Sequence, residues 1–241
     1  MRAETRHQLK TDRFRGATLD AAEMTVHWTV EHKNKLIVAG LVATVVIAAG
    51  IGLWYYLNQQ DQRASLDVSQ AVRTLDTPVR PPNMPPQPDQ PSFASSRERA
   101  STAQKQFQAV IAKYPHTHAA EVARYFVGVT AAGLGDNATA EQDFKAAASG
   151  YNKDFASLAK FALASVYRQT GRQKDAIALY QQLIDKPTLS VGKTMAQMEL
   201  AATYEQANQP LEAKRIYQQV EKDNPASEVG QMASAKLQEM K

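Results

Sequence analysis

The sequence predicts an all-α protein with a single N-terminal transmembrane helix followed by an α-solenoid of helical repeats. Three observations predict this fold. Residues 36–57 form an uncharged apolar run, residues 96–241 are rich in helix-forming residues, and four segments of that second region align around one aromatic residue each. Such self-similarity at a nearly constant spacing is typical of stacked helix pairs.

The first 35 residues form a polar tail of mixed charge. Asp20 and Glu23 have the spacing of a capping box, and Met24 and Trp28 share one side of the helix that would follow. We therefore expect a short amphipathic helix in a cytoplasmic tail, residues 1–35. Trp28 is interpreted as an anchor at the membrane interface. A docking helix for a cytosolic partner is the second interpretation.

Residues 36–57 read LIVAGLVATVVIAAGIGLWYYL, which as a helix spans the roughly 30 Å hydrocarbon core of a bilayer. The run is longer than the apolar core of a signal peptide, and no small-residue cleavage motif follows it. We therefore expect a retained transmembrane anchor. The chain has no cysteine, which excludes lipoprotein processing, disulfides and thiolate metal sites.

The charges that flank the span predict its orientation. Lys33 and Lys35 precede the span directly, whereas the first cation after it is Arg63. The positive-inside rule places the N-terminal tail in the cytoplasm and the C-terminal part on the other side of the membrane. Aromatic residues 54–56 end the span, as expected at the outer interface.

Residues 58–95 are predicted to hold a juxtamembrane helix and a proline-rich linker. An apolar stripe with helical spacing runs from Ala64 to Leu75, and seven of the eleven prolines lie in residues 78–91. Proline-rich chain favours extended conformations, which predicts a linker or a surface loop. In a second interpretation, the stripe is the first helix of an additional repeat and the proline segment is a long insertion in its turn.

The repeat domain is predicted at residues 96–241, and Ser95 and Glu98 form the capping box that begins it. In each unit, a small residue on the first helix and an alanine on the second allow close approach of the two helices. A Gly or Asn between them supplies the turn, and an aromatic residue packs toward the next repeat. The aromatic residues are Phe107, Phe144, Tyr180 and Tyr217, the alanines are Ala103, Ala140, Ala176 and Ala213, and the turn residues are Gly135, Gly171 and Asn208.

Three full repeats follow from this register, with a flanking helix at each end. The helix before them is unpaired, and the helix after them shields the last apolar face from solvent, as solenoids require. The repeats are predicted at residues 117–152, 154–188 and 190–225, and the flanking helices at 96–113 and 226–240.

The pattern of small residue, aromatic residue, turn Gly, Ala and aromatic residue resembles the tetratricopeptide repeat. In that family the first helix of each pair lines a concave groove, so the resemblance implies a peptide-binding groove. Its positions here are mostly apolar and lack the Lys and Asn that grip a peptide C-terminus, which favours extended apolar segments. The alternative is that these residues are buried against adjacent helices. They are Val122, Tyr125, Val129, Leu158, Phe161, Ser165, Met195, Met198 and Ala202.

No motif for catalysis, for a cofactor or for a metal is present, so we expect a protein that is not an enzyme and has no cofactor. His116 and His118 lie in a predicted loop without an acidic neighbour in sequence. From residue 97 onward, 18 Lys and Arg are interspersed with 15 Asp and Glu. Nucleic-acid binding requires clustered cations, so we expect no nucleic-acid partner.

The complete layout resembles the YfgM-type family of tetratricopeptide-repeat proteins, which are ancillary subunits of the bacterial Sec translocon. The proline segment is not part of that resemblance. It implies an inner-membrane protein whose periplasmic repeats bind unfolded or secreted polypeptides beside Sec translocon subunits, and a tail that contacts a regulator. The alternative is a membrane-tethered scaffold or regulator of an envelope-assembly or division complex. The matching segments are HWTVEHKNKLIVAG, KYPHTHAAEVARYF, LASVYRQTGRQKDAIALYQQLID and TYEQANQPLEAKRIYQQVEKDNP.

Overall fold

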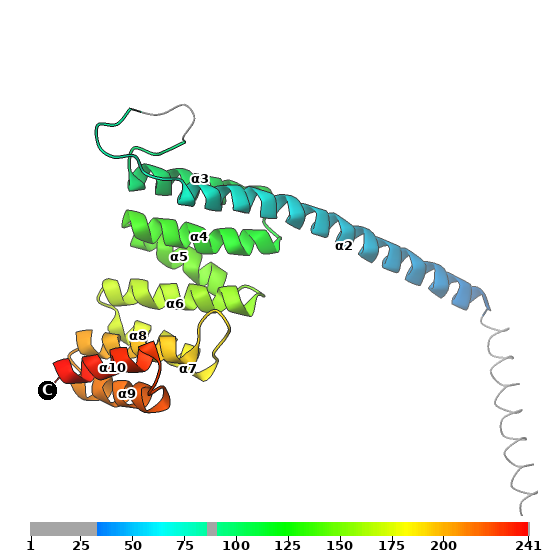
Figure 1. Cartoon of the computed structure of the whole chain (residues 1–241). Coiled ribbons are helices and arrows are strands. Elements are labelled where there is room, and N and C mark those ends of the chain that lie inside the picture. Colours follow the sequence, from blue (N-terminus) through cyan, green and yellow to red (C-terminus); the bar gives the residue numbers. More distant parts are fainter. Residues whose placement is uncertain (1–32, 86–90, 241) are drawn as a thin grey trace, which may run out of the picture. The chain divides into compact units, whose positions relative to one another are not determined.

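The computed structural model describes residues 33–85 and 91–240, and these residues form helices joined by turns and loops, without a strand of regular sheet (Figure 1). The predicted all-α class is confirmed. The amphipathic helix expected near Trp28 lies outside the described residues. The chain divides into two compact units, residues 1–56 and residues 57–241, which are described separately here.

In the first unit the described residues belong to helix α2, which spans Lys33–Asp76 and continues into the second unit. Among the described residues, α2 is the one helix long and apolar enough to cross a membrane, with a mean hydropathy of 2.6 in its most apolar window. None of that window is buried against protein. A helix that is apolar on all sides and uncovered is suited to lipid rather than to water.

Helix α2 does not end where the apolar run ends. Residues 58–76 contain neither Gly nor Pro, so nothing in the sequence interrupts the helix before Asp76, two residues before Pro78. The juxtamembrane helix predicted after residue 57 is thus continuous with the apolar helix, and α2 includes both segments.

The second unit begins with a helix pair formed by the last turns of α2 and by α3 (Ser96–Lys113). Ala64, Val68 and Ala71 are buried in one cluster with Phe107 and Val110 of α3. The sequence pattern predicts an unpaired helix at residues 96–113, but the structure pairs it with the apolar stripe of α2. The repeat packing therefore starts before residue 96, as in the second interpretation of that stripe.

The proline segment connects these two helices. Its two ends are joined by an isolated bridge between Val79 and Phe93, in which the Arg80 N–H donates to the Phe93 carbonyl at 2.9 Å. The Arg99 guanidinium donates to the Thr77 carbonyl at 3.1 Å. The two described ends of the proline segment are thus held together next to the α2–α3 pair.

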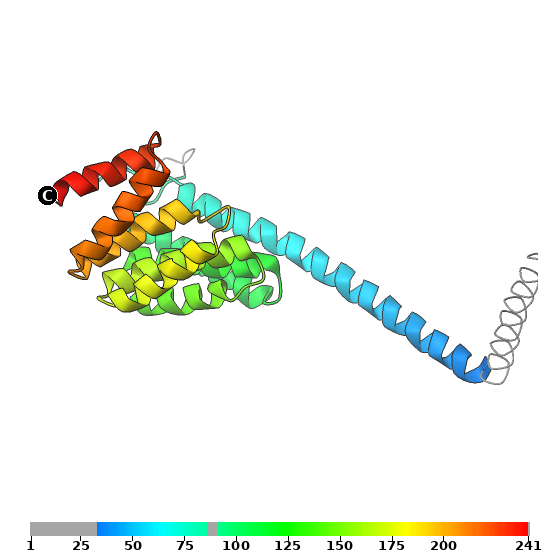
Figure 2. The ribbon, with the colours of Figure 1, turned by 90° about the horizontal axis from the view of Figure 1, so that it is seen from below.

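Three further pairs and a final helix follow, and Figures 1 and 2 show them stacked one after another. Their positions agree with the three repeats and the terminal helix expected from the aromatic spacing. The pairs are α4 (His118–Leu134) with α5 (Asn137–Ala148), α6 (Lys153–Gln169) with α7 (Gln173–Asp185), and α8 (Lys193–Gln206) with α9 (Pro210–Asp223), and the final helix is α10 (Glu228–Glu239).

The turn within each pair is made by the predicted residue. Gly135 and Gly171 have φ angles of 84° and 79°, and Asn208 has a φ angle of 55°. Glycine adopts this left-handed conformation without strain, and asparagine tolerates it better than most residues. The side chain of Asp136 then caps α5 by accepting from the Thr139 N–H at 3.1 Å.

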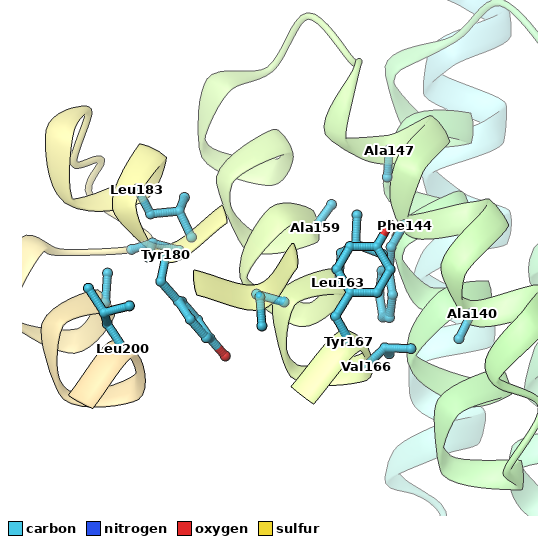
Figure 3. Packing of buried hydrophobic residues seen from close by; sticks show 14 of the residues in the cluster. Ala140, Phe144, Ala147, Ala159, Leu163, Val166, Tyr167, Tyr180, Leu183 and Leu200 are labelled. Carbon is cyan, nitrogen blue, oxygen red and sulfur yellow. The ribbon is translucent and has the colours of Figure 1, made fainter. Parts of the chain in front are cut away.

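The four repeat aromatic residues are almost completely buried, which confirms their predicted place in the core. Gly128 shows why a small residue stands on a first helix, because a β-carbon there would lie 2.6 Å from the Phe144 ring. The central cluster joins the α4–α5, α6–α7 and α8 segments, and Figure 3 shows fourteen of its side chains, Tyr180 and Leu200 among them.

Candidate functional site

The first helices of successive pairs form one continuous face of the repeat unit. The Tyr125 ring of α4 lies 6.3 Å from the Phe155 ring of α6, measured between centroids. The guanidinium of Arg168 on α6 forms an ion pair with Glu199 on α8 at 3.0 Å. We call this surface the first-helix face and define it by the nine predicted groove positions: Val122, Tyr125, Val129, Leu158, Phe161, Ser165, Met195, Met198 and Ala202.

Two of these positions are clearly exposed. Val129 is 37% exposed and Met195 is 50% exposed, whereas the other seven are half-buried. None of the nine is completely buried. The first-helix face is therefore neither an open apolar groove nor a sealed core, and it has features of both predicted alternatives.

The aromatic positions of the face belong mainly to the core. The Tyr125 ring packs against Phe126 at 5.3 Å and against Phe144 at 5.9 Å, measured between centroids. Burial raises the pKa of the Tyr125 hydroxyl. Phe161 meets Tyr180 edge to face at 5.6 Å. A substitution of Tyr125 or Phe161 would therefore change the stability of the fold together with any binding.

Helix α10 extends the face by one residue that the sequence argument missed. Met232 lies five residues after the N-cap Ser227, just as Val122 lies five residues after the N-cap Thr117. Met232 follows Met195 at the repeat spacing and is 55% exposed. If the α10 sequence is aligned with the first helices of the repeats, Met232 falls at the position of Met195 and can be predicted from the sequence.

The Arg168–Glu199 pair is the main polar feature of the face. The two side chains are 20% and 34% exposed. The Tyr180 hydroxyl behind them is buried without a hydrogen-bond partner among the described residues. Burial raises the pKa of Tyr180, as does the nearby Glu199 carboxylate. Burial and neighbouring glutamates likewise raise the pKa of Tyr217 to about 12.

A second polar cluster joins the α4–α5 pair to the α6–α7 pair. The Glu141 carboxylate accepts from Lys145 at 2.6 Å, from Arg172 at 2.9 Å and from the Tyr167 hydroxyl at 3.2 Å. The guanidinium of Arg172 also lies 3.9 Å from the centre of the Tyr167 ring. Lys145 and Arg172 lower the pKa of Glu141 to about 2. We interpret this cluster as a link between repeats.

Over the residues that the structure describes, no group of three or more His, Cys, Asp or Glu side chains is placed to hold a metal ion. His118 begins α4, and His116 lies in the exposed turn before it. The first-helix face therefore carries three exposed apolar side chains, Val129, Met195 and Met232, and one ion pair.

Comparison with protein families agrees with this architecture. A tetratricopeptide repeat-like domain model matches residues 26–187, and a tetratricopeptide repeat model matches residues 195–227. The first match includes the apolar and proline-rich segments and the α2–α3, α4–α5 and α6–α7 pairs. No curated protein matches the chain. Because the first match covers more than half of the chain, this protein belongs to the tetratricopeptide repeat-like domain family, whose repeats are modules for protein–protein interaction.

Proposed function

We propose that this protein is a membrane-anchored binding protein for unfolded or newly secreted polypeptides, and that it acts as a chaperone-like ancillary subunit beside the Sec translocon of a bacterial inner membrane. Residues 36–57 anchor it, the N-terminal tail lies in the cytoplasm, and the repeats lie in the periplasm. The observation that carries the binding role is the presence of three exposed apolar side chains on the first-helix face. They are Val129 of α4, and Met195 and Met232, which occupy one repeat register on α8 and α10.

The chemistry of these three side chains favours clients of varied sequence. Methionine has an unbranched and polarizable side chain that adapts to differently shaped partners. The half-buried positions of the first-helix face supply further aliphatic and aromatic surface, so an extended apolar segment gains contact without displacing the core. An apolar segment of an unfolded chain is exposed to water before binding, and its burial supplies the driving force.

The contribution of these three side chains to binding can be tested without disturbing the fold. We expect Val129→Ser, Met195→Ser and Met232→Ser, combined in the full chain in nanodiscs, to weaken binding of a fluorescent unfolded polypeptide measured by anisotropy. Because these side chains are not buried, the melting temperature followed by circular dichroism should remain close to that of the wild type.

Leu211→Ser is the matched control. Leu211 is 81% exposed but lies at the start of the second helix α9, not on the first-helix face. Its substitution removes exposed apolar area and should leave the affinity unchanged. If the triple variant binds the unfolded polypeptide as tightly as the wild type, the first-helix face has no part in client binding.

The anchor and its orientation are tested separately. Alkaline phosphatase fused after Lys241 should be active, and green fluorescent protein at the same place should be dark, because the repeats cross the membrane. A mature chain that begins near residue 58 would show cleavage instead of anchoring. Purification after mild crosslinking then identifies the partner: translocon subunits and unfolded clients support this proposal, whereas one fixed envelope complex supports a scaffold.

A further inference from the structure

Two large apolar side chains are the most exposed in the repeat unit, and both lie in loops between helix pairs. Tyr151 is 90% exposed in the α5–α6 loop, and Leu189 is 99% exposed in the α7–α8 loop. Neither contributes to a core cluster. Each of these loops follows a second helix and precedes a first helix, so both lie at the edge where first helices begin (Figure 1). We call this edge the loop edge.

The loop edge also carries lysine side chains. A surface hollow of about 730 Å³ lies between the two loops, and its lining includes Lys153, Lys160 and Lys186. Lys193 begins the next first helix. Within the described residues, none of these four lysines forms an ion pair with a carboxylate. Three carboxylates lie beside these lysines. Glu121 accepts from the Tyr151 N–H at 3.4 Å, Asp154 accepts from the Ser190 N–H at 3.4 Å, and Asp185 lines the hollow.

Another first helix, α4, begins next to the residues that follow the apolar run. Leu57 ends that run, and Asp61 follows one helical turn later. The Asp61 carboxylate accepts from the Ala119 N–H at 3.0 Å, and Ala119 is the second residue of α4. Leu57 itself belongs to the second unit, and about 6 Å of helix length separates it from Asp61.

We propose that the loop edge rests on the surface of the membrane in which the chain is anchored, with Tyr151 and Leu189 in the interfacial layer and the four lysines against anionic lipid headgroups. Exposed aromatic and aliphatic side chains beside unpaired lysines are the combination that binds anionic lipid surfaces. This inference rests on the membrane anchor of the proposed function and adds a second, reversible contact with the bilayer. Such a contact would hold the repeats near chains that leave the membrane.

A depth measurement on the full chain tests this proposal. The chain has no cysteine, so Leu189→Cys introduces a single site for an environment-sensitive NBD label. In nanodiscs that contain phosphatidylglycerol, lipids brominated on their acyl chains should quench this label. The control is Gln209→Cys, which places the same label in the α8–α9 turn within a helix pair, and this label should not be quenched.

The charge dependence makes the test specific for a lipid surface. Lys153→Gln and Lys186→Gln should lower the docked-to-undocked ratio roughly fivefold for each lysine removed. Purely zwitterionic nanodiscs should reduce the quenching in the same direction. Equal quenching of the labels at residues 189 and 209, or quenching that is independent of lipid charge and of the lysines, would overturn the proposal.

Incorporation into nanodiscs separates this proposal from the proposed function. If the chain enters nanodiscs and binds an unfolded polypeptide, but its label at residue 189 is not quenched, the contact of the loop edge with the membrane is excluded and the proposed function is unaffected. A chain that does not enter nanodiscs overturns the anchor and the docked edge together.

Discussion

Two junctions between neighbouring helix pairs have the same backbone register but are stabilised by different side chains. We call the junction of α4–α5 with α6–α7 the first junction, and the junction of α6–α7 with α8–α9 the second. The aromatic residue of the first is Phe144, which clusters with α6 and also packs against Gly128 within its own α4–α5 pair. That of the second is Tyr180, whose hydroxyl is buried without a partner among the described residues.

The polar contacts differ as well. The first junction has the Glu141 cluster with Arg172 and Tyr167. The second has the Arg168–Glu199 ion pair on the first-helix face and a hydrogen bond from the Gln181 amide to the Tyr204 hydroxyl at 3.4 Å. The repeat motif thus specifies where helices pack, and residues outside the motif supply the polar contacts that stabilise each junction. In this chain the second junction leaves its ion pair on the surface proposed to bind clients.

The largest expected effect comes from removing the aromatic residue of the second junction. Tyr180→Ala should lower the free energy of unfolding by roughly 3–5 kcal/mol, because it deletes a completely buried ring. Gln181→Ala on the exposed side of the same helix should stay within about 0.5 kcal/mol. Similar denaturation curves for the two variants, followed by circular dichroism, would contradict the assigned register.

The first junction is more sensitive to added volume. Gly128→Ala should destabilise the fold by about 1–2 kcal/mol, because the new methyl group would overlap the Phe144 ring by more than helix propensity compensates. The corresponding residues Ala164 and Ala201 already carry this methyl group. Denaturant unfolding of Gly128→Ala with and without Phe144→Leu measures the effect, and a smaller side chain at residue 144 should restore part of the stability.

Making the second junction resemble the first should be stabilising. Tyr180→Phe removes the buried hydroxyl and retains the ring, so we expect a gain of about 1 kcal/mol in the free energy of unfolding. Thermal and denaturant unfolding give this value directly. A loss of stability would show that the hydroxyl has a partner, for instance a bound water molecule.

The smallest effect is the pH dependence of the first junction. Folding lowers the pKa of Glu141 to about 2, so its contribution is complete above the ordinary glutamate value of about 4.5 and is lost as the pH falls toward 2. Glu141→Gln should therefore be less stable than the wild type at pH 6, and the two melting temperatures should converge near pH 2. A difference that does not depend on pH would exclude an ionic contribution.

The sequence by itself determined the helix pairs, their turns and the positions of the buried aromatic residues. These features follow from helical periodicity, from the conformational freedom of Gly and from the need of each pair to bury an apolar face, all of which are local. Local composition also indicates that a helix over residues 36–57 is long and apolar enough to cross a membrane. Most of the fold could therefore be predicted.

Only the tertiary structure decided which side chains of the first-helix face are available to a partner. Tyr125 and Phe161 are assigned to the first-helix face by the same helical periodicity as the exposed Val129 and Met195. Neighbouring helices nevertheless cover much of the Tyr125 and Phe161 rings. The pairing of α2 with α3 across the proline segment, and the gathering of Tyr151 and Leu189 at one edge, are likewise non-local. Exposure depends on residues far away in the chain, and periodicity within one helix carries no information about them.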